Sequence, residues 1–513
     1  MGIRSTISSF LGFGRKKRSR KSSAVSQRLY SGANTSRLTA DWVTSGSSAD
    51  QEIKSSIKKL RNRSRQLCRD NDYARVAVRQ IKNNVIGTGA RLQAQVRMQR
   101  GKGRMDVAVN DAIERAWKQW GKKNTCNTAG MYSWTEMCRL CAGAMVESGE
   151  VILRIVRKPF GGGKIAFALE VMESDRLDED YSATADSLGR EWRMGVQVDK
   201  WQRPLQYAFL SEHPGDSSFP ISSREKTHVF VDAKDVIHLF ESTRPGQTRG
   251  VPWLASAIEK LHHLDGYSSA EIIRARAASA LMGFVVSPEG ELDPGGEVYN
   301  GERVTSFEPG VFKYLNPGEN VTVPQLDSPS GEYEPFVRTN LRAMAAGLGI
   351  SYESLSSDYS QTNYSSSRLS LLETRDTYRA LQNYFVENLY ERVYEAWMEM
   401  AVMSGVLNLA GYESEPTRYH ECRWLSRGWT WVDPVKEVEA YKEAVRCGFT
   451  TQAEVLSMQG SDLEELLTAR RNELDLAEAL DLNFDTQIEE VEEATIDNVE
   501  ADSSNDDGSN SKD

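Results

Sequence analysis

Histidine, cysteine and long apolar runs are scarce in this chain of 513 residues. The six histidines are scattered and leave little for general-base catalysis. None of the common nucleophile, zinc-protease, phosphate-loop or dinucleotide motifs occurs. There is also no run of eighteen apolar residues, so we expect no membrane span and no membrane partner. We therefore expect a protein that is not an enzyme, with no catalytic residue, no metal and no cofactor.

The six cysteines are too few and too irregularly spaced for a disulfide scaffold, which favours synthesis in a reducing, intracellular compartment. Cys138 and Cys141 form a C-x-x-C pair, which could be half of a zinc site or a redox pair. No second pair and no nearby histidine accompany it, and it lies within a helical pattern. We predict that both residues are buried structural thiols.

Charge is concentrated at the two ends of the chain. Residues 485–513 hold eleven acidic residues and one lysine, which accounts for the whole formal net charge of −10. Residues 1–21 hold seven basic residues and no acid. We predict that residues 1–49 are a basic flexible arm and residues 481–513 an acidic disordered tail. Such an arm could bind nucleic acid or an acidic partner, although basic runs are more often simply solvated.

A second basic segment follows the arm. Between residues 49 and 85 apolar positions recur at helical spacing with a break near residues 70–72, which predicts one or two helices. Contact with nucleic acid or an acidic neighbour is one interpretation of its many cations, and a solvated helix face is the other. The ten basic residues are Lys54, Lys58, Lys59, Arg61, Arg63, Arg65, Arg69, Arg75, Arg79 and Lys82.

The middle of the chain combines helices with strands. An amphipathic pattern predicts a helix over residues 106–120, and a capping box of Ser133 and Glu136 predicts another over 134–147. Turns rich in Gly, Pro and Asp separate five strand-like runs, at 150–157, 164–172, 194–198, 205–210 and 236–241. We predict an α+β domain with a mostly antiparallel sheet over residues 86–250.

The stretch from residue 336 to 403 has the clearest organisation. A helical pattern over 336–349 ends in paired glycines, and the Ser-, Tyr- and Asn-rich run 351–367 has no apolar periodicity, which predicts a loop. We then expect a helix over 368–404, roughly 50 Å long at about 1.5 Å per residue. Its apolar positions, three or four apart for the most part, are Leu372, Tyr378, Leu381, Phe385, Leu389, Val393, Trp397, Met400 and Met403.

The remaining segments predict helices around a small β module. Pro252 can occupy the first turn of a helix expected over residues 252–283, and residues 284–335 have the pattern of short strands and turns. Residues 418–424 predict a strand. Three capping patterns predict short helices over residues 434–480: Asp433 followed by Pro434, Thr451 paired with Glu454, and Ser461 paired with Glu464.

Specific short motifs are spread over residues 50 to about 475. They are DYARVAVR (72–79), NVIGTGARLQ (84–93), RGVPWL (249–254), YLNPGE (314–319), AGLGISYE (346–353), DYS (358–360), NYSSSR (363–368) and GWTWVDPVKE (428–437). NYSSSR is the most distinctive of them. Their order and spacing resemble those of the portal proteins of tailed bacteriophages, lambda family. The two charged ends lie outside the resemblance.

The resemblance implies an α+β, portal-type ring subunit with an α/β wing, a two-helix stem, a small β clip, a long spine helix and a helical crown. Carried over by position, the wing is 50–250 with 412–432, the stem helices are 251–283 and 336–350, the clip is 284–335, the tunnel loop is 351–367, the spine helix is 368–404 and the crown is 433–480.

The resemblance also implies a function, namely a dodecameric ring at one capsid vertex through which viral DNA is packaged and ejected. Expected partners are further copies of the chain, double-stranded viral DNA, the terminase large subunit, then the head-tail adaptor, the major capsid protein and, as a further candidate, a scaffold protein. The expected location is the portal vertex of the virion, after synthesis in the bacterial host cytoplasm.

Two sets of residues are expected to carry this function. Tyr, Ser, Asn and Gln side chains can hydrogen-bond phosphates without the ion pairing that would hold DNA in place. The expected channel residues are Asp358, Tyr359, Gln361, Asn363, Tyr364 and Ser365. The expected docking residues of the clip are Phe312, Tyr314, Asn316 and Glu319. An ordinary surface loop is the alternative for each loop residue.

Two other classes of function stay open from the sequence. One is a non-phage nucleic-acid-binding helical scaffold protein, based on the basic residues between positions 1 and 82. The other is a thiol or metal enzyme built on Cys138 and Cys141.

Overall fold

The computed structural model describes most of the chain between residues 37 and 482. The described residues are 37, 40–44, 46–98, 104–216, 227–280, 284–286, 297–299, 302–304, 320–322, 331, 333–480 and 482. The chain consists of two compact units, Met1–Ser48 and Ala49–Asp513. Nearly all of the basic arm and of the acidic tail lies outside the described residues, as do the clip residues Phe312, Tyr314, Asn316 and Glu319. No described helix has the length and apolar character needed to cross a membrane.

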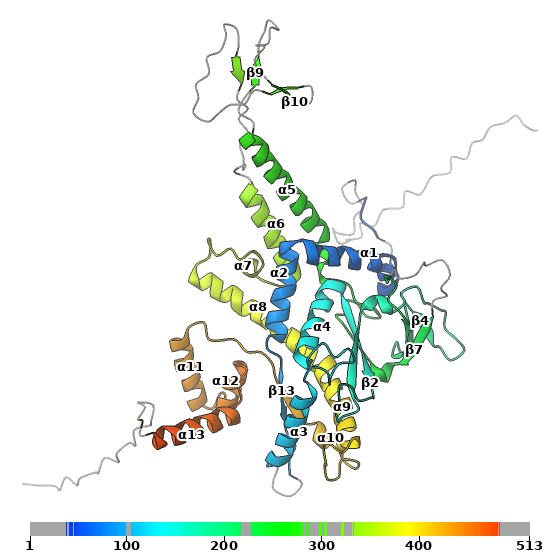
Figure 1. The fold of residues 1–513 in the computed structure, drawn as a ribbon, viewed down its shortest axis with the longest axis vertical. Helices are drawn as coiled ribbons and strands as arrows, with labels where there is room; N and C mark the ends of the chain where they lie inside the picture. The colour runs from blue at the N-terminus through cyan, green and yellow to red at the C-terminus, as the bar shows by residue number, and fades with distance from the viewer. Residues whose placement is uncertain are drawn as a thin grey trace, which may run out of the picture. The chain divides into compact units, whose positions relative to one another are not determined.

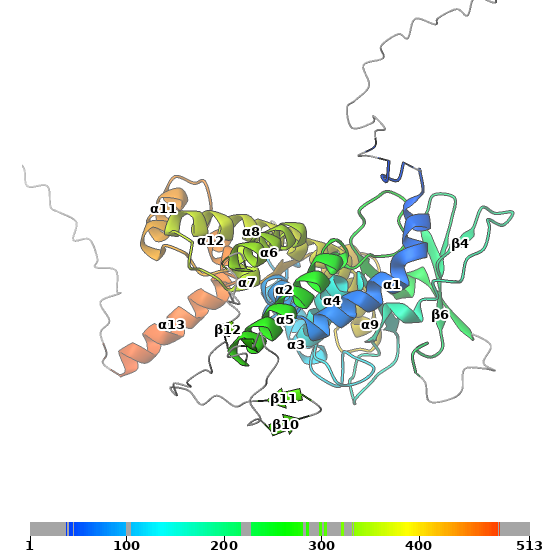
Figure 2. The same ribbon diagram turned by 90° about the horizontal axis from the view of Figure 1, so that it is seen from above.

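Two helices open the larger unit. They are α1 (Ala49–Asp70) and α2 (Asp72–Ile81), and a π-helical turn, Lys82–Ile86, continues α2. Asn71 caps α2 by accepting hydrogen bonds of 3.1 Å from two of its backbone N–H groups. The predicted break near residues 70–72 is thereby confirmed. Helix α1 packs along α5 (Ile258–Ala280), as Figure 2 shows.

The strands of the middle region pair in an antiparallel manner, as predicted. In one sheet β2 (Glu150–Val156) lies between β3 (Ala168–Met172) and β8 (Val236–Phe240). The second sheet has the order β4 (Glu191–Arg193), β5 (Val196–Val198), β6 (Pro204–Leu210) and β7 (His228–Asp232). A third pair joins distant parts of the chain, β1 (Arg91–Ala94) and β13 (Cys422–Leu425).

The sequence-based strand boundaries need three corrections. Strand β3 begins only at Ala168, so residues 164–167 precede it. Residues 416–420 form the short helix α10 (Pro416–His420), because Pro416 fixes a helical φ at its first turn, and only the end of the predicted strand 418–424 is a strand. Strands β4 and β7 were not predicted. In β7 only Val231 is buried, which leaves a weak alternation pattern.

Helices pack against the first sheet and against the β1–β13 pair. Helix α4 (Trp134–Ser148) packs against β2 and α2, and α3 (Val107–Trp120) packs against β1 (Figure 1). The predicted capping box of α4 is confirmed. The Ser133 N–H donates to Glu136 Oε2 at 2.8 Å, and the Glu136 N–H donates to Ser133 Oγ at 3.3 Å.

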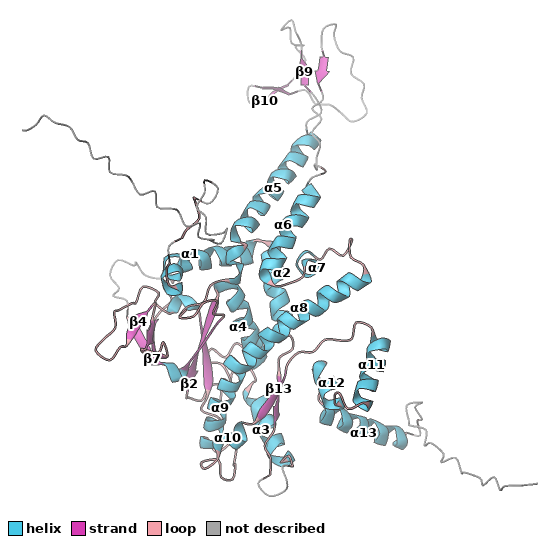
Figure 3. Cartoon of the chain, turned by 180° about the vertical axis from the view of Figure 1, so that it is seen from behind, coloured by secondary structure: helices cyan, strands magenta, loops and turns pink. Residues whose placement is uncertain are grey.

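A continuous helical segment crosses the structure, as Figure 3 shows. It consists of α8 (Tyr364–Phe385), a π-helical turn, Val386–Tyr390, and α9 (Glu391–Met403). The long helix is thus confirmed, although it begins at Tyr364, four residues before the predicted start. Most of the predicted apolar positions are buried, but Leu381 is only partly buried, and Leu372 and Met403 are 43% and 73% exposed.

Five tryptophans form the centre of the larger hydrophobic core. They are Trp117 and Trp120 of α3, Trp134 of α4, Trp397 of α9 and Trp424 of β13. The Trp117 ring centroid lies 4.8 Å from that of Trp120, 5.0 Å from that of Trp397 and 5.6 Å from that of Trp424. The edge contacts of Trp117 with Trp397 and Trp424 add to the free energy of burial. The core therefore fixes the long helix to elements that lie far away in the sequence.

Two helices flank the segment with short strands. Helix α5 follows a 3₁₀ turn, Trp253–Ser256, and packs against α6 (Tyr333–Leu348). Between them in sequence, β9 (Phe284–Val286) pairs with β12 (Asn320–Thr322) and β10 (Glu297–Tyr299) pairs with β11 (Glu302–Val304). The prediction of short strands within residues 284–335 is confirmed.

The last described helices are short, as predicted. They are α11 (Pro434–Arg446), α12 (Gln452–Met458) and α13 (Leu463–Ala479). Asp433 and Thr451 cap the first two. The third predicted cap is wrong by one residue, because Asp462 rather than Ser461 accepts from the backbone of α13, at 2.8 Å from the Glu465 N–H. The predicted capping box of Thr451 and Glu454 is incomplete, because the Glu454 carboxylate accepts a hydrogen bond from the Thr450 hydroxyl instead.

The position of Trp397 in the tryptophan core predicts how much stability the protein loses when this side chain is truncated. Replacing Trp397, which is fully buried, by Ala should lower the free energy of unfolding by about 3–5 kcal/mol, because it leaves a large cavity. Urea unfolding followed by circular dichroism measures this. Trp201→Ala is the matched control, since Trp201 is 74% exposed. Equal losses of unfolding free energy in the two variants would contradict the assignment of Trp397 to the centre of the core.

Candidate functional site

A seven-residue polar loop, residues 357–363, joins the short helix α7 (Tyr352–Ser356) to α8. The prediction of a loop over residues 351–367 is therefore too long at both ends. Ser351 caps α7 by accepting from the Ser354 N–H at 3.2 Å, and Asn363 caps α8 by accepting from the Ser366 N–H at 2.9 Å. Ser and Asn are favoured at caps, so a run that lacks apolar periodicity can still start helices.

Asp358 organises the loop from within. One carboxylate oxygen accepts a hydrogen bond of 2.6 Å from the Ser360 hydroxyl and one of 3.0 Å from the Ser360 N–H, and the other accepts from the Tyr352 hydroxyl at 2.8 Å. These bonds lower the pKa of Asp358 to about 2. Ser357, with φ of 57°, is in the left-handed region that closes α7. The charge of Asp358 is thus used to hold the loop in shape.

The predicted channel residues divide into two groups. Asp358 and Asn363 make hydrogen bonds within the loop and its caps. Tyr359, Gln361 and Ser365 are exposed, Tyr359 by 64% of its surface. The side chain of Tyr364 lies outside the description, although its backbone begins α8. The structure brings the described members together on one loop and the first turn of one helix (Figure 3).

Neighbouring elements hold the base of the loop. Helix α7 packs against α2 and α6, and the Gln80 side-chain amide donates to the Ser354 carbonyl at 3.3 Å. The Arg342 guanidinium lies 5.3 Å from the ring centroid of Tyr352, the tyrosine that bonds to Asp358. On the other side, Arg368 pairs with Glu437 of α11 at 3.3 Å. The loop therefore projects from a fixed base.

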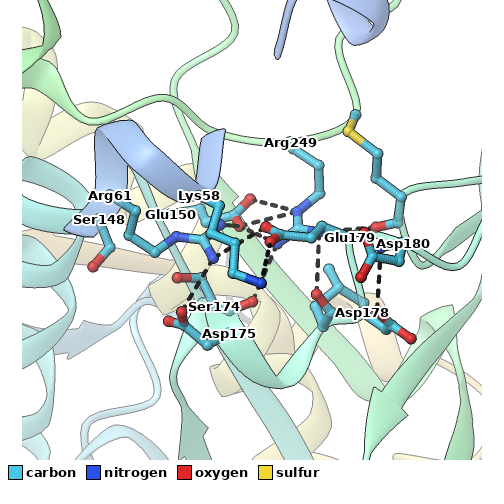
Figure 4. A network of polar contacts seen from close by, with 12 residues as sticks. Lys58, Arg61, Ser148, Glu150, Ser174, Asp175, Asp178, Glu179, Asp180 and Arg249 are labelled. Carbon is cyan, nitrogen blue, oxygen red and sulfur yellow. Dashed lines mark hydrogen bonds and ion pairs between the residues drawn. The ribbon is translucent and has the colours of Figure 1, made fainter. Parts of the chain in front are cut away.

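A buried ion network in the middle region was missing from the sequence-based reasoning (Figure 4). Glu150, the first residue of β2, is fully buried. Its carboxylate accepts from Arg61 at 3.1 Å, from Arg249 Nε at 3.0 Å and from the Gly250 N–H at 2.8 Å. His238 Nε2 lies 3.0 Å from Glu150 Oε2. Arg249 belongs to the RGVPWL motif, but its partner is 99 residues away in sequence, so no local pattern could show the pair.

The network keeps Glu150 charged. Burial alone would raise the pKa of its carboxyl group, but the charge of Arg249 and the contact with His238 outweigh burial and lower the pKa well below its usual range. Arg249 also donates to the carbonyls of Met194 at 2.8 Å and Ser174 at 3.1 Å. The network thus joins α1, β2, β8 and the chain segment that leads into α5.

The C-x-x-C pair is buried and reduced. Cys138 and Cys141 are free thiols on α4, and neither is exposed by more than 2%. Burial raises the pKa of Cys141 to about 12 and that of Cys138 well above its ordinary value, so both remain protonated and unreactive. The prediction of buried structural thiols is confirmed.

One group of potential metal ligands occurs among the described residues. Ligand atoms of Glu173, Asp175 and His213 lie within 4.8 Å of one another. Asp175, however, accepts from Arg65 and lies 3.5 Å from Arg61, so cationic side chains already neutralise it. Two guanidinium groups beside the carboxylates disfavour a metal ion there.

The chain is similar to known proteins over most of its length. The family described as "Phage portal protein, lambda family" matches residues 35–382. The probable portal protein of Halomonas phage phiHAP-1 is 30% identical over 448 residues, which make up 86% of this chain and 85% of that protein. Portal protein B of Escherichia phage lambda is 23% identical over 469 residues, 84% of this chain and 86% of that protein. Among solved structures, a chain in the neck of an empty gene transfer agent (GTA) particle is similar with a TM-score of 0.43 and 15% identity, covering 78% of this chain and 92% of that one.

The ion network predicts a stability loss that depends on pH. Glu150→Gln keeps the shape of the side chain but removes the anion that pairs with the buried Arg249 and one of the three carboxylates beside Arg61, which should cost about 3–5 kcal/mol at neutral pH. Chemical unfolding at several pH values measures it. Because the folded-state pKa of Glu150 is depressed, its stabilisation is complete above the unfolded pKa, about 4.3, and falls as the pH drops below it, by about 1.4 kcal/mol per pH unit.

The difference between wild type and variant should therefore narrow below about pH 4. Glu173→Gln is the control, since the Glu173 side chain is 64% exposed and should contribute little. A constant difference between the wild type and Glu150→Gln from neutral pH to pH 3 would contradict the assigned role of the Glu150 charge.

Proposed function

This chain belongs to the lambda family of phage portal proteins, and from this we propose that its copies form a dodecameric ring at one capsid vertex, through which viral DNA is packaged and ejected. The observation that carries the proposal is the family match over residues 35–382, together with a portal relative that is 30% identical over 86% of the chain. The ring docks the terminase large subunit during packaging and the head-tail adaptor afterwards. Its remaining partners in the virion are the major capsid protein and, during assembly, a scaffold protein.

The elements fit a division into portal regions. The wing is formed by α1 to β8 with β13, the stem by α5 and α6, the clip by β9 to β12 and their connections, the spine by α8 and α9, and the crown by α11 to α13. The tunnel loop of this proposal is the loop of residues 357–363 with the first turn of α8. Residues Phe312, Tyr314, Asn316 and Glu319 of the clip dock the terminase and then the adaptor.

Apolar surface on the crown supports assembly with further copies. Among the described residues of α11 and α12 no side chain is buried, and in α13 only Ala477 is. Short helices of this kind need tertiary packing to be stable. Large apolar side chains that are at least 42% exposed instead cover them: Val435, Val438, Phe449, Met458, Leu466, Leu467, Leu476 and Leu480. Neighbouring copies in a ring would cover this surface.

The chemistry of the loop supports a sliding contact with DNA. Its exposed side chains Tyr359 and Gln361 are neutral hydrogen-bonding groups, and Ser365 adds a hydroxyl. Neutral donors can touch successive phosphates without releasing counterions, so the affinity for any one position stays low. The single carboxylate of the loop, Asp358, makes its hydrogen bonds within the loop and to Tyr352. No ATPase is assigned to this chain, and the packaging motor belongs to another protein.

Assembly can be tested by electron microscopy of the purified full-length protein. Negative-stain images should show closed dodecameric rings with a central hole, because the exposed apolar surface of each copy is then covered. Single globules at the same protein concentration, with salt-sensitive DNA binding, would contradict the ring and favour a nucleic-acid-binding scaffold protein.

The tunnel loop can be tested by removing its exposed groups. Tyr359→Ala with Gln361→Ala should leave ring assembly intact, because both side chains are exposed, and should lower the amount of packaged, nuclease-protected DNA several-fold. An in vitro packaging reaction measures this amount. Trp201→Ala removes an equally exposed ring outside the loop and serves as the control. If packaging, DNA retention and ring assembly all stayed unchanged, the loop would not line the channel.

A further inference from the structure

The basic face of α1 and α2 is only partly neutralised. Four of its ten basic residues have carboxylate partners within 4.0 Å: Lys58 with Glu179, Arg61 with Glu150, Arg65 with Asp175, and Arg69 with Asp70. In these four pairs the charge of the basic residue is balanced by a carboxylate of the same chain. Toward the carboxyl end of the segment the pairing stops. No carboxylate among the described residues lies within that distance of Arg79 or Lys82.

These unpaired cations line a pocket of about 300 Å³ formed by the end of α1, by α2 and its π-helical turn, and by α4. Five of the lining residues are basic and one, Glu147, is acidic. The full lining is Cys68, Arg69, Arg75, Val78, Arg79, Lys82, Arg139 and Glu147. Apolar lining is limited to Val78 and the protonated thiol of Cys68, so the pocket offers little to a nucleobase or another apolar group.

Contacts with uncharged groups hold two of the cations in place. The Arg139 guanidinium donates to the Gly87 carbonyl at 2.8 Å and to the Asn83 side-chain carbonyl at 2.8 Å. The stem of Lys82 crosses α4 at Gly143, where a Cβ atom would lie 3.1 Å from Lys82 Cδ. The positions of both positive charges are therefore fixed, and neither contact neutralises a charge.

The cations destabilise one another. Burial lowers the pKa of Lys82, and the charge of Arg139 lowers it further. The charge of Glu147 raises the pKa of Lys82 and offsets part of this effect, but Glu147 is one acidic residue beside five basic ones. A site that holds like charges together at fixed positions gains free energy when a small anion enters, because the repulsion between the cations is then screened.

From this geometry we propose that the pocket of Arg79, Lys82 and Arg139 binds a phosphate group of the double-stranded DNA backbone. A phosphodiester offers two unsubstituted oxygens in a compact group, which suits one ammonium and two guanidinium groups around a pocket of this size. Arg75 is exposed at the same pocket and can contact the next phosphate along the strand. Such contacts position DNA without reading its sequence.

This contact is separate from the proposed channel function. The pocket shares no residue with the loop of residues 357–363. The loop presents neutral side chains, whereas the pocket presents fixed positive charges. DNA held here is bound tightly and in a salt-dependent manner.

The test measures the salt dependence of DNA binding by the full-length protein. A fluorescein-labelled duplex of arbitrary sequence is titrated by anisotropy at several KCl concentrations. Arg79→Gln with Lys82→Gln should weaken binding several-fold and reduce the slope of log Kd against log salt by about one to two. Lys118→Gln with Lys122→Gln removes two exposed charges from the end of α3 and its following turn, outside the pocket, and should leave the slope nearly unchanged.

Folding is checked in the same variants by thermal unfolding and by ring formation in electron microscopy. Arg79→Lys retains the charge and should retain the slope, which a purely structural role of Arg79 would not require. Equal affinities and slopes for the pocket variant and the control variant would overturn the proposal while leaving the ring untouched.

Two further binding experiments decide between possible anions. If inorganic phosphate bound the wild type but not the pocket variant, while the two proteins bound DNA with equal affinity and salt slope, the pocket would be a site for the free anion, and the proposal would be wrong. If a peptide of residues 485–513 bound in a manner that depended on Arg79 and Lys82 while DNA binding did not, the pocket would hold the acidic tail. The predicted loss of DNA binding and of salt dependence in the pocket variant supports a site for the DNA backbone.

Discussion

The buried carboxylate of Glu150 is the interaction on which the middle of the molecule depends. A charge without water must be compensated by other charges and hydrogen bonds, and Glu150 receives both from Arg61, Arg249 and the Gly250 N–H (Figure 4). These partners come from α1 and from the segment that leads into α5. The first helix, the central strand and the start of α5 are therefore fixed relative to one another by one side chain.

The backbone around this charge is arranged to let the partners approach. Gly149, with φ of 86°, ends α4, and a Cβ atom there would lie 2.3 Å from the Val251 carbonyl carbon. At Gly250 a Cβ atom would lie 2.2 Å from the Gly149 carbonyl oxygen. Only glycine permits this close crossing. The close backbone crossing at the two glycines thus lies next to the ion network, and it places the Gly250 N–H 2.8 Å from the Glu150 carboxylate.

The sequence predicted most of what depends on local chemistry. Capping residues such as Ser133 and Asp433 placed helix starts, and the apolar spacing of the long helix predicted its buried face from Tyr378 to Met400. The predicted helix starts were wrong where two neighbouring residues could both act as the cap, as at Ser461 and Asp462. They were also wrong where the capping residue lies within a polar run, as at Asn363. The Glu150 pairs and the basic pocket could not be predicted, because they join residues that only the folded chain brings together.

In the function proposed for this chain, the polar loop and the basic pocket treat a polyanion in opposite ways. Helix α2 contributes to both, because Gln80 supports α7 at the base of the loop while Arg79, its neighbour in sequence, lines the pocket. Adjacent residues on a helix point about 100° apart, so a single helix can support an uncharged surface on one side and present charge on another. A conduit requires low affinity where DNA moves and tolerates high affinity only where DNA rests. Keeping the cations of α2 away from the side that supports the loop would let one element meet both requirements of the proposed conduit.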